Sequence, residues 1–337
     1  MQRQWCRRGL VATLLLPLAG LFAALVFFRR QAYRRGWLKS VRLPVPVVVI
    51  GNISVGGTGK TPLTVWLARR LRALGRHPAI VSRGYRGSGA VQPVDDQSQP
   101  AEVGDEALLL FRQSGCPVYV GRDRVAAARA LLAAHPEIDL VLCDDGLQHY
   151  RLGRDVELAL IDSRGLMNGW PLPAGPLREP ASRLRQVDAL IVHGERGDGD
   201  FRMRLCGTCF YRLDAPECVA SADELRPLRL HAVAGIGDPA RFFTHLAALG
   251  LDFVAHAFAD HHVYRAAELD FAGDAILTTE KDAVKLSALP PELRLPVWVL
   301  PVVAEVEPDL ARFVLAKIMD RPVARPRRLQ VAAGRNE

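Results

Sequence analysis

The stretch VVVIGNISVGGTGKT, residues 47–61, decides the fold of this chain. It begins as a β-branched apolar run, typical of a buried strand, and continues into a glycine-rich loop that ends in Gly-Lys-Thr. The residues that follow predict a helix, because leucines recur about one turn apart from Leu63 to Leu74. Pro62 suits the first turn of that helix, where a missing N–H costs nothing. Strand, loop and helix in this order are typical of a phosphate-binding P-loop.

The residue types in the loop suit a bound triphosphate. Glycines let backbone N–H groups turn toward phosphate oxygens, and the helix N-terminus adds partial positive charge. Lys60 is expected to reach the terminal phosphates, and Thr61 offers a hydroxyl to Mg²⁺. The motif departs from the usual pattern at one position, where Ser54 replaces the first glycine. The predicted nucleotide-binding residues are Ser54, Val55, Gly56, Gly57, Thr58, Gly59, Lys60 and Thr61.

The formal net charge of +8 is concentrated at the two ends of the chain. Residues 1–42 hold nine Lys or Arg and no acidic residue, and residues 321–337 hold five Arg and one Glu. The whole chain carries +8, whereas the body between the two ends, residues 43–320, carries a formal net charge of −5. A body of this sign is a poor nucleic-acid binder, whereas basic ends suit contact with anionic lipid.

An uncharged run of nineteen residues, Leu10 to Phe28, lies within the basic N-terminus. Its length approaches what crosses a hydrocarbon core at about 1.5 Å per residue. Three basic residues precede the run and six follow it, which predicts that the bulk of the protein lies on the cytoplasmic side. The run ends in Phe-Phe-Arg-Arg rather than in small residues, so a cleaved signal peptide is disfavoured. Pro17 and Gly20 leave open whether the segment spans the membrane or lies in its interface, and we favour spanning or deep insertion.

A second stretch, IDLVLCDD at 138–145, predicts a buried strand that ends in the carboxylates Asp144 and Asp145. Downstream of a Gly-Lys-Thr loop by two strand-and-helix units, such a strand end is typical of a Walker B element, which holds Mg²⁺ directly or through water. The loop continues with Gln148 and His149, whose side chains are suited to orient a nucleophile or a phosphate.

Other loops after predicted strands carry side chains suited to a charged ligand, because parallel sheets bind ligands at the carboxyl ends of their strands. Arg83 and Tyr85 follow one predicted strand, Arg122 follows the next, and Arg178 stands in a proline-rich loop further on. Each arginine has the alternative of being an ordinary surface residue.

Two adjacent carboxylates, Asp105 and Glu106, open a predicted helix. Carboxylates at this position often only cap a helix and complement its dipole. In a kinase-like sheet they are also candidates for a general base and a metal ligand.

A new α/β unit is predicted from Arg229. Residues 235–240 formally fit a dinucleotide fingerprint, but a proline in the first helical turn disfavours that interpretation. The adjacent His261 and His262 fit a catalytic partner or a structural pair better than a metal site. The segment TTEKD at 278–282 lacks the Lys-x-Asp spacing that reads guanine, which favours ATP.

The six cysteines are expected to be mostly reduced in a chain that faces the cytoplasm. Cys206 and Cys209 have the spacing of a metal or redox pair, but a four-ligand zinc site needs a second clear pair. We therefore favour two half-buried thiols in a hairpin over zinc.

Taken in order, these blocks resemble the lipid A disaccharide 4′-kinase family (tetraacyldisaccharide 4′-kinase), from the basic N-terminus to about Leu310. The family commonly lacks the same first glycine at the position of Ser54. The basic tail and the Cys206/Cys209 pair are not features that we assign to the family. The blocks that carry the resemblance are Gly51-Asn52 through Thr61-Pro62, Ser82-Arg83-Gly84-Tyr85, Gly104-Asp105-Glu106, Gly121-Arg122-Asp123-Arg124, Asp144-Asp145-Gly146-Leu147-Gln148-His149, Gly175-Pro176-Leu177-Arg178-Glu179, Asp260-His261-His262 and Thr278-Thr279-Glu280-Lys281-Asp282.

The resemblance implies transfer of the γ-phosphate of ATP to the 4′-hydroxyl of a tetraacylated glucosamine disaccharide 1-phosphate, giving lipid IVA in lipopolysaccharide synthesis. It places the enzyme at the cytoplasmic face of the bacterial inner membrane, with the lipid substrate and membrane lipid as partners and no evident protein partner. Asp105 would be the general base, paired with His261 rather than His262. Residues implied around Mg²⁺ are Thr61, Glu106 and Asp145; those that balance phosphoryl charge are Lys60, Arg178 and Arg122; further substrate or supporting residues are Arg83, Tyr85, Asp144, Gln148, His149 and His262.

The predicted fold is therefore α/β: a P-loop NTPase-like parallel sheet flanked by helices, with a second, smaller α/β domain and an N-terminal membrane helix. The expected segments are a membrane anchor at 1–42, a P-loop kinase core at 43–195, a linker or hairpin region at 196–228, the smaller domain at 229–320 and a basic tail at 321–337.

Two other functions share parts of this pattern. A membrane-tethered regulatory P-loop ATPase of the partitioning or metallochaperone type would have the same loop, Walker B strand and sheet, but would hydrolyse nucleotide without a sugar acceptor. A non-enzymatic, membrane-anchored nucleotide-binding scaffold would bind nucleotide and transfer nothing.

Overall fold

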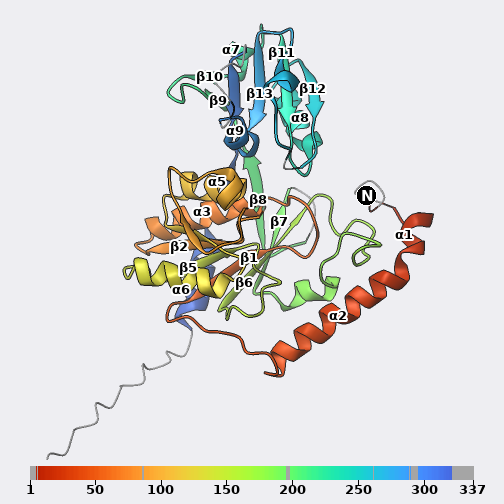
Figure 1. The fold of residues 1–337 in the computed structure, drawn as a ribbon, viewed down its shortest axis with the longest axis vertical. Helices are drawn as coiled ribbons and strands as arrows, with labels where there is room; N and C mark the ends of the chain where they lie inside the picture. The colour runs from red at the N-terminus through yellow and green to blue at the C-terminus, as the bar shows by residue number, and fades with distance from the viewer. Residues whose placement is uncertain are drawn as a thin grey trace, which may run out of the picture.

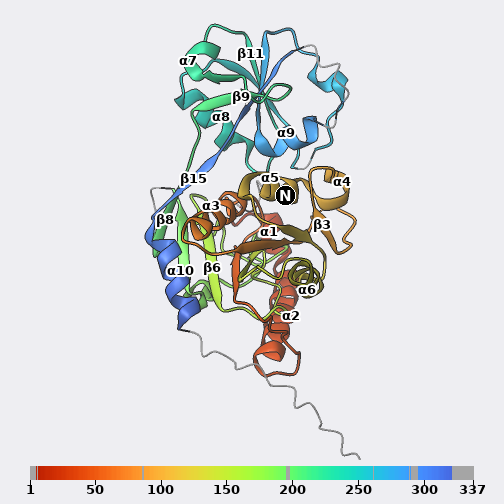
Figure 2. The same cartoon turned by 90° about the vertical axis from the view of Figure 1, so that its left-hand side faces the viewer.

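The described part of the chain forms two lobes, one above the other in Figures 1 and 2. The computed structural model describes Trp5 and residues 7–85, 87–194, 198–260, 262–287, 289 and 295–320. His261 and the basic tail at 321–337 lie outside these residues. Each lobe is built around its own sheet, so the prediction of two α/β units is confirmed.

The larger lobe contains a nine-stranded sheet in the order β15-β8-β7-β6-β1-β5-β2-β4-β3. Strands β8 to β4 in that order are parallel, and the edge strands β15 and β3 are antiparallel to their neighbours. The strands are β1 (Val47–Gly51), β2 (Pro78–Ser82), β3 (Gln92–Val94), β4 (Val118–Val120), β5 (Leu140–Asp144), β6 (Val156–Asp162), β7 (Ala189–His193), β8 (Phe201–Cys206) and β15 (Val303–Val306).

Helices cover both faces of this sheet, because alternate residues of each buried strand point to opposite sides. Val48 and Ile50 of β1 belong to the core under α3, α5 and α10, whereas Val47 and Val49 belong to the core under α6. The helices are α3 (Lys60–Ala73), α4 (Pro100–Val103), α5 (Asp105–Ser114), α6 (Arg124–Ala134) and α10 (Asp309–Met319), with a 3₁₀ helix at Ala181–Gln186.

The smaller lobe has a six-stranded sheet in the order β10-β9-β14-β13-β11-β12. Its four strands from β14 to β12 are parallel, and β9 is antiparallel to both of its neighbours. The elements are β9 (Cys209–Arg212), β10 (Val219–Ser221), α7 (Ala222–Leu225), β11 (Leu230–Ala234), α8 (Pro239–Ala248), β12 (Phe253–Ala257), a 3₁₀ helix at Ala266–Leu269, β13 (Ala275–Thr279), α9 (Glu280–Leu286) and β14 (Val297–Leu300).

The chain crosses between the lobes twice, which corrects the predicted boundaries. It leaves the larger lobe after β8 and returns between β14 and β15, and the two crossings lie so close that a Cβ on Gly207 would stand 2.2 Å from the Pro301 carbonyl oxygen. The region 196–228 is therefore no linker, because it holds β8 of one sheet and β9 and β10 of the other. Residues 303–319, predicted in the smaller domain, belong to the larger lobe.

The pair Cys206 and Cys209 brackets the first crossing. Cys206 ends β8 of the larger sheet and Cys209 begins β9 of the smaller sheet, so the hairpin interpretation is wrong. Both are free thiols, and no group of three or more His, Cys, Asp or Glu among the described residues could hold a metal ion.

The N-terminal apolar run forms two helices, α1 (Leu10–Leu14) and α2 (Leu16–Arg34), that extend along one side of the larger lobe (Figure 1). Within the described residues, no helix has the length and apolar character to cross a membrane, so the expected membrane-spanning helix is not found. The segment is held to the lobe at both ends: Trp5 Nε1 donates to the Pro173 carbonyl at 3.1 Å, and the rings of Tyr33 and Tyr150 lie 5.9 Å apart.

Candidate functional site

The P-loop and the predicted Walker B carboxylates meet at the carboxyl edge of the larger sheet. The loop connects β1 to α3, and β5, which ends at Asp144, is the direct neighbour of β1 with Ile50 opposite Asp144. Lys60 and Thr61 are the first two residues of α3, as predicted. Parallel neighbours place their following loops side by side, so the sequence pattern located this edge correctly.

A charged cluster lies beside the loop. Arg178 Nη1 donates to both carboxylate oxygens of Asp145, at 3.1 and 3.0 Å, and Lys60 Nζ lies 3.6 Å from Asp145 Oδ1. Burial alone would raise the pKa of Asp145, but the charges of Lys60 and Arg178 outweigh it and hold the pKa far below its ordinary value. Asp145 is therefore a carboxylate at any physiological pH, held between two cations.

The neighbouring carboxyl group has the opposite tendency. Asp144 is buried and accepts a hydrogen bond from Thr64 Oγ1 of α3 at 3.0 Å. Burial raises the pKa of Asp144 to about 7, with the charge of Glu106 as the next cause. The carboxylates of α5 and β5 thus lie within electrostatic range of each other, and their mutual repulsion is a feature that a divalent cation would relieve.

The loop at 171–179 supports the P-loop from one side. The Val55 N–H donates to the Pro176 carbonyl at 2.9 Å, Ser54 forms an isolated bridge with Leu177, and the Arg178 N–H donates to the Ile53 carbonyl at 2.7 Å. These bonds fix the start of the P-loop at the position where the usual glycine is missing. The same loop places Arg178 over Asp145, so one segment shapes the phosphate cradle and contributes a charge to it.

Gln148 joins the loop after β5 to this support. Its Nε2 donates to the Asn52 carbonyl at 3.0 Å and to Glu179 Oε1 at 2.8 Å, and its Oε1 lies 3.4 Å from Arg178 Nη1. Gln148 therefore supports the two loops, and its role in orienting a nucleophile or a phosphate stays a prediction.

Asp105 and Glu106 start α5, and cations of the smaller lobe face both. Glu106 Oε1 accepts from Lys281 Nζ at 3.0 Å, and Asp105 Oδ2 lies 3.9 Å from Lys285 Nζ. Asp105 is buried, and its Oδ1 accepts the N–H of Glu106 at 2.9 Å. The carboxylates predicted for acid–base and metal chemistry therefore lie at the junction of the two lobes.

Several buried polar atoms have no hydrogen-bond partner within the described structure: Asn52 Nδ2 and Thr58 Oγ1 between β1 and α3, and His149 Nε2 in the loop after β5. Such atoms cost free energy when left unpaired, so their position marks a place where a polar ligand is expected. Burial, followed by the charge of Arg124, lowers the pKa of His149 to about 4, so this ring is neutral at physiological pH.

The residues predicted to meet the second substrate are placed differently. Arg83 and Arg122 are exposed, and Tyr85 retains 49% of its surface. Arg122 packs against Gly89, because a Cβ there would lie 2.6 Å from Arg122 Nε. Among the described residues, no hydrogen bond or ion pair joins Arg122 to the Lys60 cluster, so its role in balancing phosphoryl charge stays a prediction.

The two adjacent histidines have different outcomes. His261 lies outside the described residues, so its pairing with Asp105 stays a prediction. His262 is engaged within its own lobe, with Nε2 3.0 Å from Glu268 Oε2 and its ring 4.7 Å from that of Phe258. A structural role therefore explains His262.

Sequence reasoning missed several residues that reach the loop. Arg124 is buried and donates to the Asp145 carbonyl at 3.3 Å, although only its neighbour Arg122 was predicted at the site. Asp162 and His193 end the two strands beyond β1, where a polar residue at a strand end was a usable signal. Lys281 and Arg241 come from the smaller lobe, and nothing local in the sequence indicates which edge they face.

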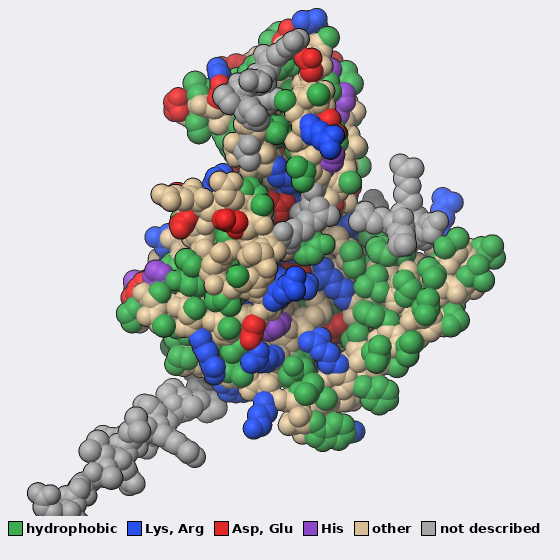
Figure 3. All heavy atoms as spheres, in the orientation of Figure 1, with side chains coloured by type: hydrophobic (Ala, Val, Ile, Leu, Met, Phe, Trp, Pro, Cys, Tyr) green, Lys and Arg blue, Asp and Glu red, His purple; other side chains and the backbone are tan. Residues whose placement is uncertain are grey.

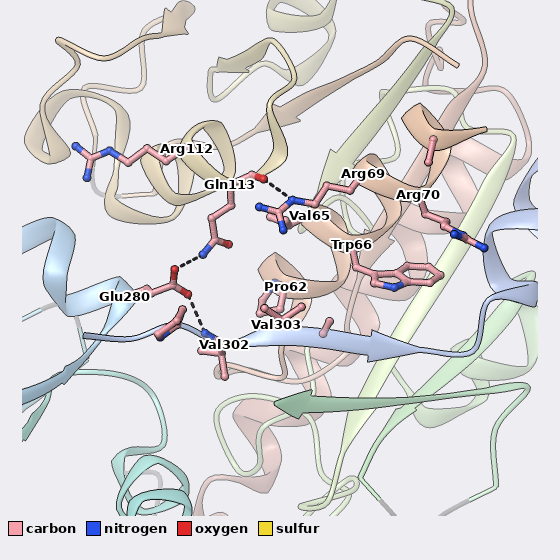
Figure 4. A pocket seen from close by; sticks show the side chains of 13 residues that line it. Pro62, Val65, Trp66, Arg69, Arg70, Arg112, Gln113, Glu280, Val302 and Val303 are labelled. Carbon is pink, nitrogen blue, oxygen red and sulfur yellow. Dashed lines mark hydrogen bonds between the residues drawn. The ribbon is translucent and has the colours of Figure 1, made fainter. Parts of the chain in front are cut away.

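A separate cavity of ≈ 400 Å³ lies between the lobes on the other side of α3 (Figure 4). Trp66 and Arg69 of α3 line it, and Glu280 lies at its floor, where it accepts from Gln113 Nε2 and from the Val302 N–H. Its lining includes neither Lys60 nor Asp145, so this cavity belongs to the crossing between lobes rather than to the P-loop.

Comparisons with known proteins agree with this geometry. A family model described as tetraacyldisaccharide-1-P 4'-kinase matches residues 11–319. The tetraacyldisaccharide 4'-kinase of Dechloromonas aromatica (strain RCB) is 53% identical over 336 residues, which cover 96% of this chain and 98% of that protein. The same-named protein of Azoarcus sp. (strain BH72) is 51% identical, with 95% and 96% covered. The crystal structure of "apo" form LpxK from Aquifex aeolicus in complex with ATP matches with a TM-score of 0.75 and 30% identity, over 92% of this chain and 100% of that one.

Proposed function

The chain belongs to the tetraacyldisaccharide-1-P 4'-kinase family, and on that premise we propose how its residues carry out the ATP-dependent phosphorylation of a lipid A precursor. The acceptor is a tetraacylated glucosamine disaccharide 1-phosphate, whose 4′-hydroxyl receives the γ-phosphate. The observation that carries the proposal is the convergence of Lys60, Arg178 and Asp145 beside the P-loop, within electrostatic range of the α5 carboxylates.

Phosphoryl transfer needs positioning and charge stabilisation more than covalent chemistry. Lys60 and Arg178 supply two positive charges where the terminal phosphate of ATP would lie, above the glycines of the loop. In the transition state, negative charge spreads over the transferred group, and fixed cations stabilise it without reorganisation. Asp145 holds both cations in place before nucleotide binds.

Asp105 is the residue that we assign to take the proton of the sugar hydroxyl. It lies at the N-terminus of α5, where the helix dipole stabilises its charged form. Lys285 of the smaller lobe reaches to 3.9 Å of it. His261 as its partner stays a prediction from the family resemblance.

The donor set at this edge fits Mg²⁺. Hard oxygen ligands from Thr61, Glu106 and Asp145 are what Mg²⁺ prefers, and it commonly keeps waters and bridges to substrate phosphates. Burial, followed by the charge of Glu106, raises the pKa of Asp144 to about 7, so a carboxylate of α5 lies near those that end β5. When bound, Mg²⁺ would neutralise charge on the ATP phosphates.

The lipid acceptor explains the exposed side chains near the loop. Arg83 and Tyr85 follow β2 at the carboxyl edge, and both are exposed. We assign them, with the unpartnered His149 Nε2, to the sugar and phosphate of the disaccharide, because both exposed residues carry polar groups at the edge where parallel sheets bind ligands.

Membrane contact is proposed for α1 and α2, lying in the interface of the bacterial inner membrane on its cytoplasmic side. Hydrophobic side chains cover the outer face of this segment (Figure 3), among them Leu21 at 60%, Leu25 at 62% and Phe28 at 67% exposure. Arginines at both ends of the segment suit anionic headgroups. An acylated sugar leaves the bilayer at a cost of about 0.8 kcal/mol per CH₂, so the enzyme must reach it there.

An acceptor-dependence assay tests the function. Purified protein with ATP and Mg²⁺ is incubated with acylated disaccharide 1-phosphate, and a parallel reaction omits the acceptor. Phosphate transfer that requires the acceptor supports the kinase. Hydrolysis of ATP at the same rate without acceptor would instead support a regulatory P-loop ATPase, and neither reaction would support a scaffold.

Vesicle co-sedimentation tests the membrane proposal. Replacing Leu21, Leu25 and Phe28 by serine should lower binding to vesicles that contain anionic phospholipid by at least about tenfold, because each exposed apolar side chain contributes on the order of 1 kcal/mol or more. The matched control replaces Val219 and Val254, which are 68% and 55% exposed on the smaller lobe, by serine. Equal binding by the two variants would refute the assignment.

A further inference from the structure

The outer side of the P-loop is held by side chains that none of the roles above uses. His193 Nδ1 lies 3.0 Å from the Thr58 carbonyl oxygen, and Arg164 Nη2 donates to the Gly57 carbonyl at 3.1 Å. A carbonyl only accepts, so His193 must carry its proton on Nδ1 and donate it. Two successive carbonyls of the loop are thus fixed by donors from the ends of β6 and β7.

Fixing these carbonyls also fixes the N–H groups that bind phosphate. The C=O of one residue and the N–H of the next share a planar trans peptide and point in opposite directions. With the Gly57 and Thr58 carbonyls turned toward Arg164 and His193, the N–H groups of Thr58 and Gly59 point the other way. Backbone N–H groups turned inward are what a P-loop presents to phosphate oxygens.

A single carboxylate, Asp162, bonds Arg164 and also an arginine of the smaller lobe, Arg241. Asp162, with 2% of its side chain exposed, accepts from Arg164 Nε at 2.9 Å and from Arg241 Nη2 at 3.0 Å. Burial alone would raise the pKa of Asp162, but the bonds to both arginines outweigh it and lower the pKa. A charged, buried carboxylate with two charge-assisted bonds orients both guanidinium groups.

Arg241 is the member of this group that comes from the other lobe. It lies on α8, and its Nη1 is 3.4 Å from His193 Nδ1, a packing contact rather than a hydrogen bond, because that nitrogen carries the proton donated to Thr58. The turn before α8 lies close to the P-loop backbone, because a Cβ on Gly237 would lie 3.1 Å from the Gly57 nitrogen. The smaller lobe therefore approaches the P-loop with its backbone at Gly237, and through Arg241 it contacts the residues that hold the loop from its outer side.

We propose that Arg241 is a positioning residue for nucleotide binding, which acts through Asp162 and Arg164, and by packing against His193, to hold the P-loop in its phosphate-binding shape. The inference rests on the proposed function only in that the loop binds ATP. The position of the smaller lobe is thereby coupled to affinity for nucleotide, through a contact that does not touch the lipid acceptor.

The test compares Arg241→Ala and Arg241→Lys with Arg226→Ala. Arg226 is a matched control, because it lies on the same lobe, is exposed and bonds the Gly250 carbonyl at 3.1 Å. Calorimetric titration with a non-hydrolysable ATP analogue measures affinity without any acceptor. Steady-state assays then give separate KM values for ATP and for acylated disaccharide, and thermal unfolding reports folding.

Arg241→Ala should raise the Kd for the analogue and the KM for ATP by about tenfold, while the acceptor KM stays within about twofold. Arg241→Lys should lie between, since one ammonium cannot reproduce the two contacts of the guanidinium. Arg164→Ala should weaken nucleotide binding similarly, and adding Arg241→Ala to it should cost less than the sum.

Wild-type affinity for the analogue in folded Arg241→Ala, or equal weakening of both substrates, would overturn the proposal. If Arg241→Ala fails to fold, Arg241→Lys decides, and unchanged affinity there overturns it as well. Because analogue binding is measured without acceptor, a wild-type protein that binds nucleotide but transfers no phosphate would refute the kinase function and leave this inference standing.

Discussion

The phosphate side and the acceptor side of the site differ in how many of their charged and polar groups already have partners within the protein. On the phosphate side, Lys60 and Arg178 both pair with Asp145, and the P-loop backbone is fixed by further bonds. On the acceptor side, Arg83 and Tyr85 are exposed, and among the described residues His149 Nε2 is buried without a hydrogen-bond partner. The phosphate side is preorganised, whereas the acceptor side is completed by the lipid and the membrane.

The largest effect is expected where the two halves meet. Replacing Asp105 by asparagine keeps its size and removes the base, so kcat should fall by about 10²- to 10⁴-fold. Affinity for a non-hydrolysable ATP analogue should change little, because Asp105 lies on α5 rather than on the loop. The measurement pairs steady-state kinetics with calorimetry, and Asp96→Asn, an exposed substitution, is the control. Near-normal turnover by Asp105→Asn would place the base elsewhere.

A smaller loss is expected from the phosphate side. Arg178→Ala removes a cation that bonds Asp145, and kcat should fall by about 10²- to 10³-fold, as when one transition-state donor is deleted. Arg185→Ala, an exposed change seven positions on, should leave kcat unchanged. A variant that lost only affinity for the acceptor would show that Arg178 belongs to the other half.

His149 provides a pH-dependent test of stability. Its pKa is about 4 in the folded protein, below its ordinary value near 6.5, so the unfolded chain takes up the proton first as pH falls. Stability is therefore lost as pH falls from about 6.5 to about 4, by on the order of 2–3 kcal/mol. His149→Gln should remove this part of the pH dependence, as measured by urea unfolding at several pH values. An unchanged pH slope would mean that His149 does not titrate as stated.

The smallest effects are expected on the acceptor side. Arg83→Ala or Tyr85→Ala should raise the KM for acylated disaccharide by about three- to tenfold, the loss of roughly one hydrogen bond, and leave the KM for ATP unchanged. Arg129→Ala, exposed on α6, is the control for Arg83→Ala. A rise in the KM for ATP alone would show that Arg83 and Tyr85 belong to the phosphate side instead.

The same division explains what the sequence could predict. The P-loop and the β5 carboxylates were predictable because their chemistry depends on residues adjacent in the chain. Arg124, Arg164 and Arg241 reach the P-loop or its neighbouring residues from separate elements, and residue type alone does not tell a buried guanidinium from a solvated one. Arg122 and Arg124 follow the same strand, yet only Arg124 is buried.

The predicted domain boundaries failed for a physical reason that can be named. A linear reading assumes that a chain leaves a domain once, but β15 and α10 return to the larger lobe after the smaller one is complete. The N-terminal helix was predicted from the absence of charge over nineteen residues, a criterion that does not exclude a segment packed along a lobe.

The double crossing also has a consequence for biosynthesis. Leu310 and Val314 of α10 share a core with Leu63 and Leu67 of α3, so the helix that carries the P-loop lacks part of its covering until the last tenth of the chain has left the ribosome. The smaller lobe, whose strands are all made before that point, is free to fold first. Nascent chains that stop short of β15 should therefore expose apolar surface on α3 and depend on chaperones, whereas the full-length chain buries that surface as soon as it is released.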